Sequence, residues 1–99
     1  MPMMVTLKIG GWLGEHLDAR WTQPKGLSIS VAEGETVLGM VRQLAAQSDV
    51  FRKGVLEKEA FGADVLVILN GIYVNPYDQS ETLLRDGDEV MLLPAVAGG

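Results

Sequence analysis

The group best suited to chemistry in this sequence lies at its end, where the apolar run VMLLPAVA (residues 90–97) is followed by Gly98 and Gly99. Glycine has no side chain, so the backbone of another protein can approach a Gly-Gly segment closely. Fully extended, Ala95 to Gly99 would reach on the order of 16 Å, enough to carry a terminal carboxylate into a partner's pocket. That carboxylate is the one group here that a partner could activate. The alternative is a frayed chain end, although solvated tails are usually polar and this one is apolar.

His16 is the only histidine, and its neighbours Glu15 and Asp18 suggest a metal ligand or a general base. An isolated titratable group in a polar loop is more simply interpreted as solvated. Asp86, Asp88 and Glu89 resemble a fragment of a calcium loop, but the twelve-residue spacing of such a loop is missing. Turn chemistry explains an Asp-Gly-Asp sequence without a metal.

The sequence offers no further catalytic arrangement. No Ser-His-Asp spacing can be defended, and Gly10-Gly11 indicates a turn, not a phosphate-binding loop. Trp12 and Trp21 are expected to cover the core. We therefore expect no metal site and no enzymatic activity in this chain.

Composition indicates one ordinary globular domain: 99 residues, of which 47% are hydrophobic and 21% are charged. The absence of cysteine excludes disulfides, cysteine zinc sites and a cysteine nucleophile, and it fits a reducing cytosol. The net charge of −5 argues against direct binding to nucleic acid and favours a partner with a basic surface. No signal peptide and no membrane-spanning stretch are expected.

Two alternating segments open the predicted fold, residues 5–9 and 27–31, which we expect to pair as antiparallel strands across a long loop. Within that loop, Leu13 and Leu17 could share one face of a helical turn. The segment 33–47 predicts a helix with Thr36 as its N-cap. The segment 49–63 predicts a further short helix bounded by Gly54 and Gly62.

The run Val65–Leu69 predicts a strand that turns at Asn70-Gly71 into a second short strand, since this pair favours a type I′ hairpin. The final strand, Val90–Leu93, is apolar at every position, which is typical of a central or parallel strand buried on both faces. The expected architecture is a two-layer α+β domain over residues 1–94, with a mixed sheet on one main helix and a flexible tail at 95–99.

The stretches VLVILNGIYVN and TLLRDGDEVMLLPAVAGG resemble the ubiquitin-like sulfur carriers of the MoaD/ThiS family, and VAEGETVLGMVRQLA resembles the family's lead into its helix. The order of elements matches along the whole chain, but only the C-terminal third carries specific motifs. The resemblance implies a β-grasp fold and a carrier, not an enzyme.

In such carriers an adenylating enzyme of the ubiquitin-activating type uses ATP to activate the last glycine, which then becomes a thiocarboxylate. A sulfur-accepting synthase consumes this group. By position, Gly99 would hold the sulfur and Gly98 would thread the partner's cleft. No cofactor would be bound, and the carrier would act in the cytoplasm. The residues that the resemblance assigns to partner binding are Leu92, Leu93, Pro94, Ala95, Val96 and Ala97.

The resemblance leaves the pathway open. Small subunits of molybdopterin synthase commonly have two phenylalanines and a second proline where this sequence has Leu92-Leu93 and Pro94-Ala95. A molybdenum or tungsten cofactor is the first expectation, with thiamine, cysteine or thiolated tRNA as alternatives. A ubiquitin-like modifier conjugated through Gly99 and a β-grasp interaction module with an inert tail are competing hypotheses.

Overall fold

A computed structural model describes residues 2–10, 21, 25–57, 60–62, 65–75, 78 and 81–94 of the chain. The strands and helices in this part follow one another as β1 (Met3–Ile9), β2 (Leu27–Val31), α1 (Val37–Ala45), α2 (Asp49–Val55), β3 (Leu56–Glu57), β4 (Ala60–Phe61), β5 (Val65–Leu69), β6 (Ile72–Tyr73) and β7 (Glu89–Pro94).

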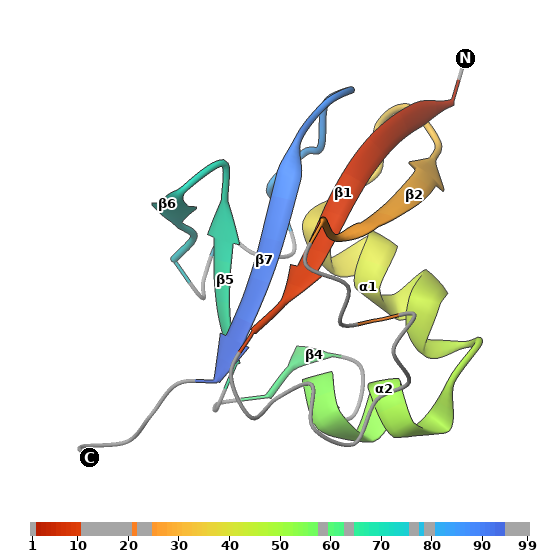
Figure 1. The fold of residues 1–99 in the computed structure, drawn as a ribbon, viewed down its shortest axis with the longest axis vertical. Helices are drawn as coiled ribbons and strands as arrows, with labels where there is room; N and C mark the ends of the chain where they lie inside the picture. The colour runs from red at the N-terminus through yellow and green to blue at the C-terminus, as the bar shows by residue number, and fades with distance from the viewer. Residues whose placement is uncertain are drawn as a thin grey trace.

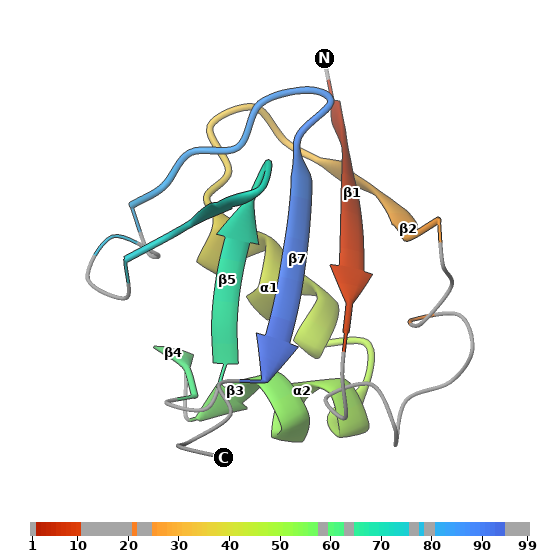
Figure 2. The ribbon, with the colours of Figure 1, turned by 60° about the vertical axis from the view of Figure 1, so that its left-hand side comes forward.

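A mixed sheet in the order β2-β1-β7-β5-β6 forms one layer, and α1 packs across one of its faces (Figures 1 and 2). β1 pairs antiparallel to β2 and parallel to β7, and β7 pairs antiparallel to β5. The predicted two-layer α+β architecture, the antiparallel pairing of the first two strands and the hairpin at Asn70-Gly71 are all confirmed. β3 and β4 form a separate small hairpin below the sheet.

Helix α1 begins as predicted at Thr36, whose Oγ1 accepts a hydrogen bond from the Gly39 N–H at 3.0 Å. Glu35 Oε1 accepts a hydrogen bond from the Thr36 N–H at 2.9 Å. A Cβ built at Gly39 would collide with this Glu35 carboxylate. Gly39 therefore weakens the helix by propensity but leaves room for the polar cap at its start.

One apolar core lies between α1 and the sheet. The side chains of β1, β2, β5 and β7 alternate, so that every second residue faces the helix. The most deeply buried of these are Val5, Leu7, Val31, Val67, Val90 and Leu92, which pack against Val37, Met40, Val41 and Leu44 of α1.

The prediction for residues 49–63 is wrong in its boundaries. The helix α2 begins after Ser48, whose Oγ caps the Phe51 N–H at 3.2 Å, and runs through Gly54 to Val55. It forms here because Phe51 and Val55, four residues apart, are both buried in the core. The β3–β4 hairpin follows Val55, in the stretch where the sequence predicted a helix.

The prediction for the last strand is correct in one respect and wrong in another. β7 is central in the sheet and parallel to β1, as expected. It is not buried on both faces, because Val90 and Leu92 face the core whereas Met91 and Leu93 are only half-buried on the opposite face. Within the described residues, α1 packs on the other face, and no helix covers the apolar residues of this second face.

Candidate functional site

The candidate site begins at the end of β7, where the strand meets the segment 95–99. Pro94, the last residue of β7, is buried and lies opposite Val65 of β5. Gly10 N–H donates to the Leu92 carbonyl oxygen at 2.9 Å, which ties β7 to β1 near the same end. The chain therefore leaves the sheet from a strand held on both sides.

The predicted partner-binding residues that the structure describes fall into two groups. Leu92 is fully buried and Pro94 is buried, so Leu92 has no surface to offer a partner and serves the core instead. Leu93 is half-buried on the opposite face, where its Cδ2 occupies the space beside Gly10. Ala95, Val96, Ala97, Gly98 and Gly99 lie outside the described residues.

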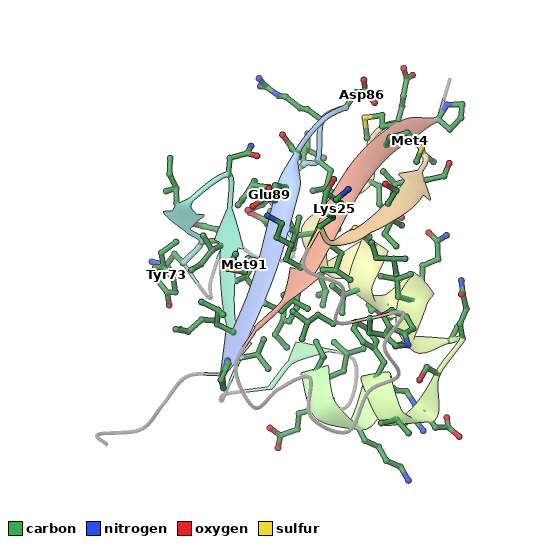
Figure 3. The ribbon with its side chains drawn as sticks, viewed as in Figure 1. Met4, Lys25, Tyr73, Asp86, Glu89 and Met91 are labelled. Atoms are coloured by element: carbon green, nitrogen blue, oxygen red, sulfur yellow. The ribbon has the colours of Figure 1, made fainter. Side chains whose placement is uncertain are left out.

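An apolar strip runs along the sheet face opposite α1, and the sequence analysis did not identify it. Leu66 lies opposite Leu93, and Ile68 lies opposite Met91 on one side and Tyr73 on the other. Side chains directly opposite on one face of a sheet lie close enough to touch. These five residues, here called the outer strip, lead along the sheet to the point where β7 ends; Figure 3 labels Met91 and Tyr73.

The border of the outer strip carries charge. Lys8 Nζ lies 3.4 Å from Glu89 Oε2, and both side chains are partly exposed. Tyr73 is 52% exposed, whereas the other four members of the strip are half-buried. An apolar centre with a polar border is the composition expected of a surface that docks another protein.

A buried aromatic pair, Trp21 and Phe51, lies near the same end of the sheet. The ring of Trp21 stacks on that of Phe51 in α2, with centroids 4.6 Å apart and an angle of 18° between the planes. Trp21 is 3% exposed, which confirms its predicted role in covering the core. A hollow of about 220 Å³ on α2 is lined by residues of α2 and β3 and by Gly62 and Val65.

At the opposite end of β7, the aspartates make turn contacts, as predicted. The Asp88 carboxylate accepts hydrogen bonds from the Arg85 N–H at 2.8 Å and from Asn70 Nδ2 at 2.9 Å. Asp86 Oδ1 accepts one from the Met4 N–H at 2.8 Å. Gly87 has the positive φ of 88° that such a turn requires. In the described part of the chain, no group of three His, Asp or Glu side chains is arranged to hold a metal ion.

His16, Glu15, Asp18 and Trp12 lie outside the described residues, as does the helical turn predicted around residues 13–17. Neither α1 nor α2, the helices in the described part of the chain, has the length and apolarity that crossing a bilayer demands.

The architecture defines a ubiquitin-like β-grasp domain, in which a mixed sheet wraps one main helix and a central last strand leads toward the C-terminus. The model of the ThiS family matches residues 19–99, which include the end of β7 and Gly98-Gly99. The chain therefore belongs to the ThiS family, within the MoaD/ThiS group of ubiquitin-like sulfur carriers. No curated protein matches the sequence at a significant level.

Solved structures agree with this assignment. The chain is similar to the Haloferax volcanii HVO 2177 protein, with 30% identity, a TM-score of 0.78 and coverage of 99% of this chain and 88% of the other. Small archaeal modifier protein 1 from Methanosarcina acetivorans is 26% identical, with a TM-score of 0.74 and coverage of 100% and 99%. A chain of the Amycolatopsis orientalis BexX/CysO complex is 27% identical, with a TM-score of 0.66 and coverage of 96% and 99%.

Proposed function

We propose that this protein is a cytoplasmic sulfur carrier whose reactive group is the carboxylate of Gly99. That carboxylate attacks the α-phosphorus of ATP on an activating enzyme and releases pyrophosphate. A sulfide-level nucleophile supplied by a partner then displaces AMP and leaves a thiocarboxylate. A carboxylate is a poor electrophile, so the adenylate step is what makes the exchange of oxygen for sulfur feasible.

The observation that carries this proposal is that the tail follows directly from a strand fixed in the centre of the sheet. β7 is hydrogen-bonded between β1 and β5, and its inward residues Val90 and Leu92 are fully buried. Five small residues follow Pro94, and the family match runs through the last of them. A fixed root with a slender end is the shape that a partner's narrow active site requires, since only glycine permits close backbone approach on both sides.

Docking of the partner is assigned to the outer strip. It is continuous with the end of β7, so a protein seated on Met91 and Leu93 would receive the tail directly. The similarity to a chain of the BexX/CysO complex supports this kind of heteromeric assembly. The partners are an adenylating enzyme of the ubiquitin-activating type and a synthase that accepts the sulfur. The chain itself acts as carrier and co-substrate, with Gly98 threading the cleft.

The direct test is activation of the full-length protein by the adenylating enzyme of its own cell, with ATP. Intact mass should show one oxygen replaced by sulfur, and fragmentation should locate the change at Gly99. Deletion of Gly99 should abolish the modification and leave the thermal unfolding midpoint unchanged, because the deleted residue lies beyond the core strand. A truncated chain that unfolds, or that is still modified, would contradict the proposal.

Among pathways, we place molybdopterin or tungstopterin synthesis first, with this chain as the small subunit of a synthase complex. Thiamine and other sulfur-containing products remain alternatives. Purified large subunits of each candidate synthase, offered the thiocarboxylate form, would distinguish them. The correct enzyme consumes the sulfur and returns the Gly99 carboxylate.

A second candidate function is conjugation to proteins. The match to small archaeal modifier protein 1 favours it specifically, because that chain is covered almost completely. Modification would begin with the same adenylate and end in an isopeptide bond between Gly99 and a lysine of a target. Adducts linked through Gly99 in a cell digest would support this role. A tail that can be blocked without effect would instead leave a β-grasp interaction module.

A further inference from the structure

We propose that Asn70, Asp86 and Asp88, here called the register clamp, are positioning residues for the Gly99 carboxylate. They lie at the start of β7, at the opposite end of the strand from the tail. By fixing which residues of β7 pair with β5 and β1, the clamp fixes how many residues extend beyond the sheet. This inference rests on the proposed function, because it concerns the reach of the same reactive group.

The apolar pattern of β7 does not define the register by itself. In the structure, Val90, Leu92 and Pro94 face the core. A slip of two residues that draws the tail into the sheet would place residues 92, 94 and 96 at these positions, and all three are again apolar. Registers that differ by two residues keep every side chain on the same face, so burial discriminates weakly between them.

Two features oppose slippage only in part. The opposite slip, which lengthens the free tail, would move Asp88 into the fully buried position of Val90 and is therefore costly. The slip that draws the tail into the sheet is opposed only by Pro94, whose backbone has no N–H to donate to a neighbouring strand. Strand pairing and core packing therefore do not exclude the slip that shortens the tail. This is the register error that the clamp must prevent.

The clamp holds β7 to β5 through Asn70. Its Nδ2 donates to Asp88 Oδ1 at 2.9 Å, and its Oδ1 accepts from the Glu89 N–H at 2.9 Å. Its own backbone N–H donates to the Glu89 carbonyl oxygen at 2.8 Å. Asn70 has a φ of 52° and Gly71 a φ of 82°, as a type I′ turn requires. The turn residue of the β5–β6 hairpin therefore also marks the first paired residue of β7.

The clamp holds β7 to β1 through Asp86 and Asp88. Asp86 Oδ1 accepts from the Met4 N–H at 2.8 Å, and Gly87 N–H donates to the Met4 carbonyl oxygen at 2.8 Å. Thr6 N–H donates to the Asp88 carbonyl oxygen at 2.9 Å. Figure 3 shows Asp86 and Met4 together at the end of the sheet where β7 begins. Both neighbours of β7 are therefore tied to it by polar contacts at the same end.

The consequence for chemistry is a matter of length. A strand advances about 3.3 Å per residue, so a two-residue slip shortens the reach of the tail by about 6.6 Å. Displacement of a reacting atom by even about 1 Å can cost two orders of magnitude in rate. A carrier in the slipped register would present its carboxylate about 6.6 Å short of the nucleotide.

The register can be measured by NMR in Asn70→Gly, which keeps the positive-φ turn and removes the side-chain clamp, and in Asn70→Gly combined with Asp88→Ala. Because residues 70 and 89 form a hydrogen-bonded pair, residues 67 and 92 form a close pair with facing Hα atoms. In wild type, the Hα atom of Leu92 should contact that of Val67 and not that of Leu69. The clamp variants should add a Leu69–Leu92 contact. A double variant that is folded and retains only the Val67–Leu92 contact overturns the proposal.

Tail length provides the functional readout. With the native tail, the double variant should be adenylated about tenfold less efficiently, the loss expected when several hydrogen bonds that favour one register are removed. An Ala-Val pair inserted between Val96 and Ala97 should restore its activation and should impair the wild-type chain. Asp78→Ala, which removes the same charge outside the clamp, should keep the native preference.

A double variant that still prefers the native tail length also overturns the proposal. Failure of the proposed function is distinguishable from this result. In that case wild type itself would not be adenylated at any tail length, while the NMR measurement would still report whether the clamp sets the register.

Discussion

Leu92 and Leu93 are identical neighbours that the sheet turns to opposite faces. Leu92 is fully buried against α1, whereas Leu93 is half-buried on the outer strip. Leu92→Ala should lower the free energy of unfolding by about 2–5 kcal/mol, because it leaves a cavity in the core. Leu93→Ala should cost much less and should instead weaken binding to the activating enzyme. Urea unfolding and a binding titration on both variants test this, and equal stability losses would contradict it.

Two glycines in helices should respond differently to alanine. Gly54 in α2 has nothing near its missing Cβ, so Gly54→Ala should stabilise the protein by up to about 1 kcal/mol. At Gly39 the added methyl group would displace the Glu35 carboxylate from the Thr36 N–H. The loss of that cap offsets the gain in propensity, so Gly39→Ala should give no net stabilisation. Thermal unfolding of the two variants side by side makes the comparison, and a similar gain at both positions would refute it.

At the scale of elements, Trp21 and Phe51 join two segments that lie far apart in the sequence. Their rings stack, and both side chains are almost fully buried. Phe51→Ala and Trp21→Ala should each cost about 3–5 kcal/mol in free energy of unfolding. The double variant should cost less than their sum, by about 0.5–1.5 kcal/mol for the lost aromatic pair. Denaturant unfolding gives all of these values, and strict additivity would show that the stacking contributes nothing.

The elements that the sequence could predict are those with local signals. The α1 helix and the β5–β6 hairpin have local signals, namely the Thr36 cap with its apolar face and the Asn70-Gly71 turn. The stacking of Phe51 in α2 on Trp21 is a contact that no local pattern reveals. The outer strip was missed for the same reason, since Leu66, Met91 and Tyr73 come together only through strand order. Ser48, by contrast, was a readable N-cap.

At the scale of the molecule, the two faces of the sheet have different tasks. One face packs on α1 and supplies the core, and the other presents the outer strip between the clamp at one end of β7 and the tail at the other. Docking can therefore be changed while the reach of the tail stays the same. Substitutions on the strip should alter affinity for a partner at any tail length, whereas the loss caused by substitutions in the clamp should be restored by a longer tail.

The strip itself can be tested with a charge. Met91→Glu places a carboxylate at the centre of the apolar surface, next to Ile68 and beside the existing Glu89. The nearest cation, Lys8 directly opposite on β1, already pairs with Glu89 at 3.4 Å. Burying a further carboxylate in an interface is costly, so affinity for the activating enzyme should fall at least tenfold. Stability should change little, because Met91 is only half-buried.

Val50→Glu is the matched control, since Val50 is an apolar residue of α2 that is 50% exposed and lies outside the strip. It introduces the same charge and should leave binding unchanged. Isothermal titration with the activating enzyme, after thermal unfolding has shown both variants to be folded, separates the outcomes. Equal affinity for Met91→Glu and wild type would show that the partner does not dock on this face. The tail would then have to reach its active site from another direction.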